Sequence, residues 1–393
     1  MGLSPFRLLC ATGLFAIFSS TISKSPVLPL YAAHLGADPS GVGMVASVSA
    51  FTGIIASIPA GILSDKLGRR RMLVFSALVF ASAPFLYLAV TEIWQLALVR
   101  FYHGFATAIF IPVAMALVAD LFHKERGEKI GWFSTSTLVG RFAAPAIGGG
   151  IIGLLMFNPG LGYKAVYAVC GVAGIVALVL AVQIPDPGGR YEGGRDWKEM
   201  SRIFRQVISS RGIVMTSAVE AAILFAYGTF ETFLPLYSIQ AGLTAYEIGI
   251  FISSQVITLA LTKPFLGRFS DRHGREAQIA VGGITGALCM AGIQYFTTFL
   301  PLLALSILFG LSLSIVTSAT SALIADLSSR DSHGSAMGIL GSIMDIGHTT
   351  GPLVSGIIAA AYGFGRAFSG AAALLALFSV IFIVYFKVSR RGN

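Results

Sequence analysis

Long apolar stretches recur along the whole chain and are separated by short polar segments. An α-helix rises about 1.5 Å per residue, so about twenty apolar residues cross the ~30 Å hydrocarbon core of a bilayer. The stretches of this length cover residues 5–33, 40–63, 72–91, 94–119, 130–157, 164–184, 213–238, 246–267, 277–297, 299–325, 335–361 and 366–386. The pattern predicts twelve transmembrane helices. The first stretch lacks a small-residue cleavage site and is too long for a signal peptide, so we expect a retained helix.

Composition supports an all-α membrane protein. Hydrophobic residues make up 55% of the chain, charged residues only 11%, and the mean hydropathy is +0.81. A water-soluble domain has about 25% charged residues. Cys10, Cys170 and Cys289 all fall inside predicted spans. An odd, scattered set of this kind argues against a disulfide framework or a metal cluster.

The net charge of +9 is distributed unevenly between the two sides of the predicted membrane. The N-terminus, the even-numbered loops and the C-terminal tail hold 21 of the 27 Lys and Arg residues, whereas the opposite loops hold only Lys164 and Arg366. Basic loops stay in the cytoplasm, so both termini are expected to be cytoplasmic in a multi-pass protein of the inner (cytoplasmic) membrane. This distribution explains the charge without a nucleic-acid partner.

An internal repeat appears when the chain is laid on itself at a shift of 206 residues. The matched pairs include Pro29/Pro235, Tyr31/Tyr237, Gly36/Gly242, Gly61/Gly267, Asp65/Asp271, Gly68/Gly274, Arg69/Arg275, Gly104/Gly310 and Asp120/Asp326. One inserted residue changes the shift to 207, which pairs Gly140, Pro145 and Gly149 with Gly347, Pro352 and Gly356. The two halves of the chain are therefore related.

Each half contains six spans, and because six is even, both halves have the same orientation in the membrane. They are predicted to be six-helix bundles related by a pseudo-two-fold axis along the membrane normal. We expect an N-terminal half at 1–184, a cytoplasmic linker at 185–212 and a C-terminal half at 213–393. Residues 196–209 place apolar side chains along one helical face, which predicts an amphipathic helix on the membrane surface. A flexible linker is the alternative.

The loop after the second span carries a distinctive motif. Its key residues are Gly61, Asp65, Gly68 and Arg69, and a weaker copy runs from Gly267 to Arg275 and includes Asp271. This motif resembles the signature loop of the major facilitator superfamily, and the chain is similar to the twelve-span drug:proton antiporter branch of that family. The resemblance implies that these residues latch the two halves together on the cytoplasmic side. The alternative is that the loop only sets topology.

Two further motifs resemble those of the same family. Arg100 and His103 lie in a helix-4 motif, although His103 stands where glutamine is usual. The helix-5 motif typical of antiporters is carried by Gly140, Pro145 and Gly149, with Ala144 in place of one glycine, and Gly351 and Pro352 belong to its copy in helix 11. Glycine and proline bend helices and permit close packing around a cavity. The resemblance favours export as the direction of transport.

Charged residues within the hydrocarbon region are costly, so they usually face a cavity or a partner. The candidates for substrate binding and proton coupling are Lys24, Arg100, His103, Arg141, Glu220, Glu231, Asp345 and His348. Lys263, near the end of its span, is explained by snorkelling. For Glu220, a structural role is the more favoured alternative.

The repeat suggests how some of these residues are arranged. Lys24 lies one position from the equivalent of Glu231, so we predict that the two flank a central cavity and pair across the halves. A static salt bridge, or a snorkelling Lys24, is the alternative. Arg141 and His348 coincide under the 207 shift, and Asp345 lies one turn before His348, which predicts a second polar focus. The alternative is a buried network that fixes helix packing.

The leading hypothesis is a proton-coupled antiporter that exports a small organic or amphipathic molecule, as in multidrug efflux, by alternating access. The expected partners are this substrate, protons and membrane lipid, and we expect a monomer. The sequence has no P-loop or HExxH motif, so no cofactor or metal is predicted and we do not expect an enzyme. Uptake or exchange of an anionic metabolite is the alternative transport hypothesis. A membrane enzyme and a transporter-derived sensor or scaffold are less favoured.

Overall fold

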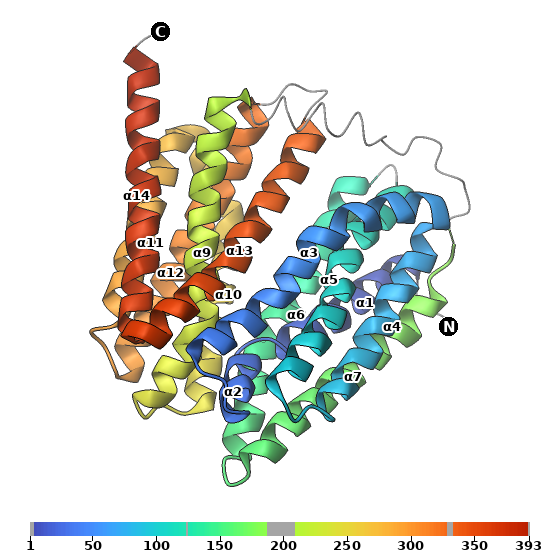
Figure 1. Ribbon diagram of the computed structural model, residues 1–393. Coiled ribbons are helices and arrows are strands. Elements are labelled where there is room, and N and C mark those ends of the chain that lie inside the picture. The colour runs from blue at the N-terminus through green and yellow to red at the C-terminus, as the bar shows by residue number, and fades with distance from the viewer. Residues whose placement is uncertain (1–3, 123–124, 187–208, 328–332, 392–393) are drawn as a thin grey trace. The chain divides into compact units, whose positions relative to one another are not determined.

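The computed structural model describes residues 4–122, 125–186, 209–327 and 333–391, and within these ranges the regular elements are all helices (Figure 1). The first half contains α1 (Pro5–Ile22), α2 (Val27–His34), α3 (Pro39–Leu67), α4 (Arg69–Tyr87), α5 (Ile93–Leu121), α6 (Arg126–Leu154) and α7 (Pro159–Gln183). The second contains α9 (Arg211–Gln240), α10 (Ala245–His273), α11 (Arg275–Ile293), α12 (Phe299–Leu327), α13 (His333–Tyr362) and α14 (Phe364–Arg391). The linker helix predicted at 196–209 lies almost entirely outside the described residues.

The helices form two compact units. Unit 1 consists of residues 1–194 together with 244–253, and unit 2 consists of residues 195–243 and 254–393. In unit 1, α1 packs on α6 and α4 packs on α7; in unit 2, the repeat-related pairs are α9 with α13 and α11 with α14. The all-α fold with two repeat-related halves is thus confirmed.

Eleven segments are long and apolar enough to cross a membrane among the described residues. The twelfth predicted span corresponds to α13, which has 30 residues like its neighbours but is less apolar because it carries Asp345, His348 and two threonines. The first predicted span, 5–33, is confirmed as one membrane-length segment, Pro5–His34, but the helix is interrupted inside it, since α1 ends at Ile22 and α2 begins at Val27. Pro26 lies in this break, and its lack of a backbone N–H disfavours a continuous helix.

Three helices of unit 1 begin with the same local signal. Ser4, Asp38 and Asn158 precede α1, α3 and α7, and each side chain accepts a hydrogen bond from the backbone N–H three residues later. A proline follows each of these caps at the first helical position. Both features are favourable at helix N-termini because the first N–H groups have no partner within the helix.

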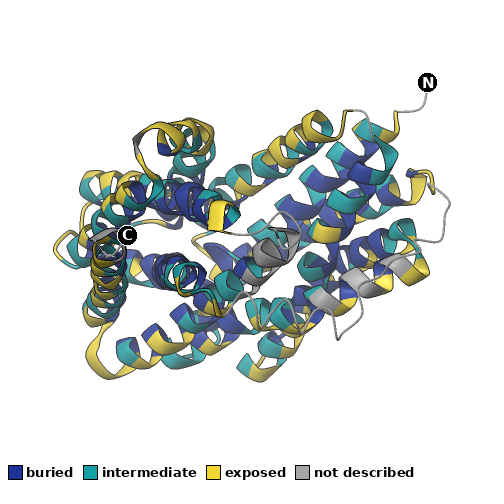
Figure 2. Cartoon of the chain, turned by 90° about the horizontal axis from the view of Figure 1, so that it is seen from above, coloured by how far each residue is buried: buried dark blue, intermediate teal, exposed yellow. Residues whose placement is uncertain are grey.

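Large apolar side chains lie exposed on many of these helices, as the exposed positions in Figure 2 illustrate. In a water-soluble protein such extensive exposure would promote aggregation. In a chain with membrane-length helices, these side chains meet lipid tails. The small and polar residues are accordingly used for packing between the helices of each unit.

Candidate functional site

Two glycines allow α13 to approach the backbone of α9. A Cβ atom on Gly347 would collide with the carbonyl oxygen of Ala221, and a Cβ atom on Gly351 would collide with that of Phe225. Only glycine permits such close contact between helices. The four-residue spacing puts both glycines on one face of α13, and this face is therefore turned toward α9.

The contact between α9 and α13 continues one turn further along each helix. A Cβ atom on Gly228 would lie 2.8 Å from Cδ of Pro352 and 2.9 Å from the carbonyl oxygen of His348. The hydroxyl groups of Thr229 and Ser355 are hydrogen-bonded across the interface at 2.8 Å. This packing fixes the rotation of α13 and places the side chain of His348 beside α9.

Glu231 and His348 form the ionisable centre of this interface. Nε2 of His348 lies 3.3 Å from Oε2 of Glu231, and the two side chains are 18% and 8% exposed. The ring of Tyr227, one turn before Glu231 on α9, stacks on the imidazole with the centroids 5.3 Å apart and the planes at 27°. The imidazole is thus held between the carboxylate of Glu231 and the ring of Tyr227.

This pair changes its charge when it binds or releases a proton. A protonated imidazole beside a carboxylate is an ion pair, whereas neutral groups share at most a hydrogen bond. In a membrane interior the difference between these two states is large, because unpaired charges there are costly. The α9–α13 interface therefore carries two side chains that form an ion pair when His348 is protonated and Glu231 is ionised.

Three other residues that we predicted to lie beside Glu231 or His348, namely Asp345, Lys24 and Arg141, are distributed between the two units. Asp345 lies one turn before His348 on α13 and is half-buried. Lys24 and Arg141 belong to unit 1, so their pairing with Glu231 and Asp345 remains a prediction. We had expected Lys24 to lie within the first helix. It stands instead in the break between α1 and α2.

A second buried carboxyl lies between α9 and α12. Glu220 is completely buried, and its Oε2 accepts a hydrogen bond from the hydroxyl of Thr320. Its other oxygen, Oε1, is buried without a hydrogen-bond partner among the described residues. A buried carboxyl with one oxygen left without a hydrogen-bond partner is costly, so Glu220 is a second candidate for a functional role within the bundle of unit 2.

In unit 1, Arg100 and His103 meet at the hydroxyl of Tyr87 on α4. Nη1 of Arg100 lies 3.5 Å from this oxygen and Nδ1 of His103 lies 3.4 Å from it. The ring of Tyr167 on α7 stacks on Tyr87 with the planes at 8° and the centroids 4.2 Å apart. Arg100 is only 3% exposed. These two residues of the helix-4 motif therefore connect α4, α5 and α7 within one unit.

The two copies of the signature loop each carry an equivalent ion pair. Nε of Arg69 donates to Oδ2 of Asp120 at 2.7 Å, and Nη1 of Arg275 lies 2.9 Å from Oδ2 of Asp326. Arg275 also contacts Asp271 at 3.2 Å. In each unit the arginine thus ties the start of one helix to the end of another.

Glycine is required at the turn of each signature loop. Gly68 and Gly274 have φ angles of 97° and 91°, in the region that strongly favours glycine. Gly61 and Asp65 lie in the last turns of α3, and their side chains are outside the described part of the structure. The turn itself therefore explains two of the motif's glycines.

The predicted helix-bend residues lie inside long helices. Gly140, Pro145 and Gly149 are on α6, and Gly351 and Pro352 are on α13. A Cβ atom on Gly140 would collide with the carbonyl oxygen of Leu14, so this glycine brings α6 against α1. Close packing is therefore explained at Gly140 and at Gly351.

Sequence reasoning missed three partners in these sites. Tyr227, Thr320 and Tyr87 contact His348, Glu220 and Arg100, respectively. It also assigned Glu231 and His348 to separate groups. The glycines at 347 and 351 offered a usable signal, because their shared face indicates which side of α13 meets a neighbour.

Membrane-length helices in two repeat-related units, with ionisable residues inside them, define a polytopic membrane transporter. The chain belongs to the major facilitator superfamily, whose family model matches residues 8–255 and 242–393. It is 28% identical over 367 residues to the multidrug resistance protein MdtG of Salmonella arizonae, covering 91% of this chain and 89% of the relative. An uncharacterized MFS-type transporter of Methanocaldococcus jannaschii is 25% identical over 372 residues, with 93% and 94% covered.

Solved structures of the same fold include a mutant of the nucleoside transporter NupG, with a TM-score of 0.82, 15% identity, and coverage of 97% of this chain and 100% of that chain. A bacterial homolog of the human lysosomal transporter Spinster, in an inward-facing conformation, has a TM-score of 0.80 and 16% identity, with 99% and 98% covered. These likenesses establish the fold.

Proposed function

We propose that this chain is a proton-coupled antiporter that exports a small organic or amphipathic molecule from the cytoplasm. The observation that carries the proposal is the buried contact between Glu231 and His348, which joins α9 to α13. We propose that this contact is strong in one protonation state and weaker in the other. The similarity to MdtG, named as a multidrug resistance protein, favours export and a broad choice of substrates.

Proton binding would be coupled to transport through the stability of the α9–α13 interface. With Glu231 ionised and His348 protonated, the ion pair holds α9 and α13 together. A proton on the carboxylate removes one charge of the pair, so the conformation that needs this contact loses its advantage over the alternative one. Transport by alternating access requires such a difference between two global states, and a single proton supplies it here.

The break between α1 and α2 supports a binding role for the neighbouring part of unit 1. Discontinuous helices in transporters free backbone groups and place charged side chains beside a cavity. Lys24 lies in this break and is half-buried. We propose that it faces the substrate pathway, together with Arg141 and Asp345.

The signature loops are proposed to act as gates in an inner-membrane protein that works as a monomer. Arg69 and Arg275 each hold two helix ends together by ion pairs. When the transporter opens on that side of the membrane, the helix ends joined by these ion pairs would have to stay together. The basic residues of these loops favour their cytoplasmic placement.

Reconstitution into liposomes with an acidic interior tests the proposal. Outward proton flow should drive tetraphenylphosphonium, an amphipathic cation, into the vesicles of wild-type protein. We expect Glu231→Gln to lose about tenfold or more of this accumulation because the carboxyl no longer exchanges a proton. The exposed Glu128→Gln, on α6, is the matched control and should behave like wild type.

Two outcomes of this experiment would contradict the proposal. One is substrate flux that ignores the pH gradient, and the other is full gradient-driven accumulation by Glu231→Gln. A fluorescent organic anion should be run in parallel. Movement of the anion alone would support the alternative, which is uptake or exchange of an anionic metabolite.

A further inference from the structure

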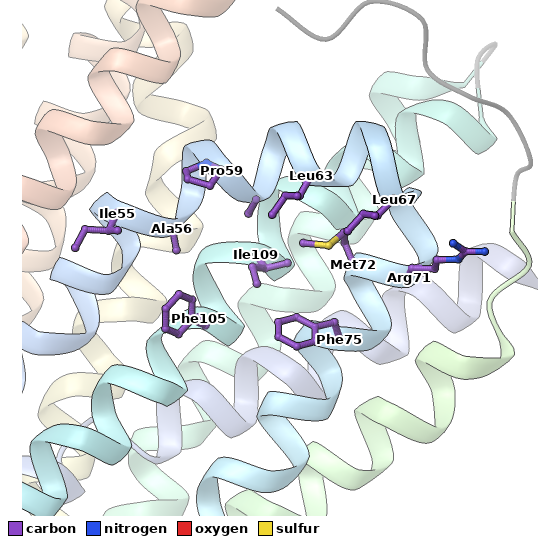
Figure 3. Close-up of a pocket in the computed structure, with 11 residues that line it drawn as sticks. Ile55, Ala56, Pro59, Leu63, Leu67, Arg71, Met72, Phe75, Phe105 and Ile109 are labelled. Atoms are coloured by element: carbon purple, nitrogen blue, oxygen red, sulfur yellow. The ribbon is translucent and has the colours of Figure 1, made fainter. Parts of the chain in front are cut away.

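A long groove with a volume of about 680 Å³ lies on unit 1 between α3, α4 and α5. Figure 3 shows its lining, with Ile55 near one end and Arg71 at the other. The full set of lining residues is Ile55, Ala56, Pro59, Ala60, Leu63, Leu67, Arg71, Met72, Phe75, Phe105 and Ile109. Arg71 is the single charged member of this set.

The groove runs along the second half of α3 and borders α4 and α5, whose membrane-length segments are Arg69–Tyr87 and Ile93–Leu121. Ile55, Leu67 and Phe75 are about half exposed, so the groove is open to the surroundings of the helix. From Ile55 to Leu67, α3 advances by about 18 Å at 1.5 Å per residue. One leaflet contributes about 15 Å of the hydrocarbon core. The groove therefore has the length and the apolar lining that suit an acyl chain.

The end of the groove carries a charge that no group in the described part of the chain neutralises. Among the three consecutive arginines, Arg69 pairs with Asp120, and Arg70 donates to two carbonyl oxygens at the end of α7, including that of Ile184. Arg71 is exposed and makes no ion pair or hydrogen bond with any described residue. At a membrane surface, a guanidinium of this kind is suited to a phosphate.

The repeat-related face of unit 2 is built differently. Gln278 takes the place of Met72, and its Nε2 donates to the carbonyl oxygen of Leu266 on α10 at 3.1 Å. This amide bridges helices where unit 1 has only the thioether. At the equivalent of Arg71 stands Ala277. The second half therefore lacks the charge at this position, although exposed Leu261, Phe265 and Val281 keep the corresponding face apolar.

We infer that the groove on unit 1 binds an anionic phospholipid, with its phosphate at Arg71 and one acyl chain along α3. The lipid comes from the leaflet on the side of the signature loop, since Arg71 directly follows that loop. This site goes beyond the proposed transport activity and does not depend on it. A water-soluble ligand is disfavoured because it would not cover the exposed apolar side chains that line the groove.

Tryptophan quenching by brominated phospholipids tests the site in the full-length purified protein. Trp94, Trp132 and Trp197 are first replaced by phenylalanine, and a reporter is introduced as Phe75→Trp. The matched control is Val281→Trp, the repeat-related position in unit 2, which is 62% exposed against 49% for Phe75. Each reporter is titrated with brominated phosphatidylglycerol and with brominated phosphatidylcholine.

We expect Phe75→Trp to prefer the anionic lipid by about fivefold, the factor that one basic residue contributes near an anionic surface. The Val281→Trp reporter should show a ratio near one. Adding Arg71→Gln should abolish the preference at Phe75→Trp, whereas Arg71→Lys and the exposed Arg126→Gln should keep it. Glycerol phosphate, which has no acyl chain, should not compete.

Equal lipid ratios at the two reporter positions would overturn the inference, and this comparison needs no change at Arg71. A preference that survives Arg71→Gln would also overturn it. Displacement by glycerol phosphate alone would contradict the placement of the acyl chain. None of these readouts measures transport, so failure of the lipid site and failure of the antiport proposal are distinguishable.

Discussion

The two units share one set of hydrogen bonds that maintains the fold. The hydroxyl of Tyr31 donates to the carbonyl oxygen of Val90 at 3.0 Å in unit 1. Its counterpart Tyr237 donates to that of Phe296 at 2.9 Å in unit 2. Both bonds lie at positions related by the 206 shift. Contacts that survive in both copies of a repeat are those that the scaffold needs.

One shared contact has exchanged its donor between the units. In unit 1, Ser76 on α4 donates to the carbonyl oxygen of Ala106 at 2.8 Å. In unit 2, Ser312 on α12 donates to that of Gly282 at 2.6 Å. The 206 shift maps each serine onto the acceptor of the other unit. The link between the two helices is therefore kept, although its donor comes from the opposite helix.

The buried ionisable residues, by contrast, are not shared. The counterparts of Tyr87, Arg100 and His103 are Ile293, Ser306 and Phe309. Glu231 and His348 correspond to Ser25 and Arg141. Each unit thus adds its own charged group to a common helix arrangement. A difference between the copies is expected where the two halves have different tasks in transport.

The largest expected effect concerns close packing in unit 2. Gly351 meets the backbone of Phe225, whereas the equivalent residue in unit 1 is Ala144, which is fully buried and tolerated. Gly351→Ala should lower the free energy of unfolding by about 3 kcal/mol because the added methyl has no room. The reverse change, Ala144→Gly, should cost only about 1 kcal/mol. Unfolding by SDS titration in mixed micelles measures both, and equal losses would contradict the asymmetry.

The contact between Glu231 and His348 in unit 2 should give a smaller but coupled effect. Glu231→Gln or His348→Asn should each cost about 2 kcal/mol, since each leaves a buried polar partner incompletely paired. The double variant should cost clearly less than the sum, because the second change removes a partner that is already lost. Ser25→Ala provides the control at the equivalent position of unit 1. Additive losses in the cycle would argue that the two side chains do not interact.

The sequence predicted the scaffold well because its signals are local or repeated. Apolar length indicates each span, and the repeat identified Arg69 and Arg275 as equivalent before their ion pairs were seen. The interruption before Val27 was missed because the apolar run continues through it. Hydropathy does not register the loss of one backbone N–H at Pro26.

The contact between Glu231 and His348 was not predictable in the same way. It depends on the rotation of α9 and α13 about their own axes. Buried residues occur on all sides of α9, so its pattern has no apolar stripe that would define a facing side. On α13, the glycines defined that side, but only the packing of the two helices identified the partner.

The signature-loop pairs offer a third test of how the units differ. Asp120 is 21% exposed and Asp326 is 56% exposed, so water screens the second pair more strongly. Arg69→Gln should lower the free energy of unfolding by about 1.5 kcal/mol, and Arg275→Gln by about 0.5 kcal/mol. The same SDS titration at low and high salt checks this ranking. A larger loss for Arg275→Gln would contradict our expectation that the ion pair of unit 1 contributes more to stability.

The smallest difference between the units is expected for the shared tyrosines. Tyr31 is buried, whereas Tyr237 is only half-buried and its acceptor lies in an exposed turn. Tyr31→Phe leaves a carbonyl oxygen without a donor in a dry environment and should cost about 1 kcal/mol, whereas Tyr237→Phe should cost about half as much because water replaces the lost bond. Parallel unfolding titrations measure the difference. Identical small losses would mean that burial does not distinguish these copies, and that the shared bonds contribute equally to both units despite their different surroundings.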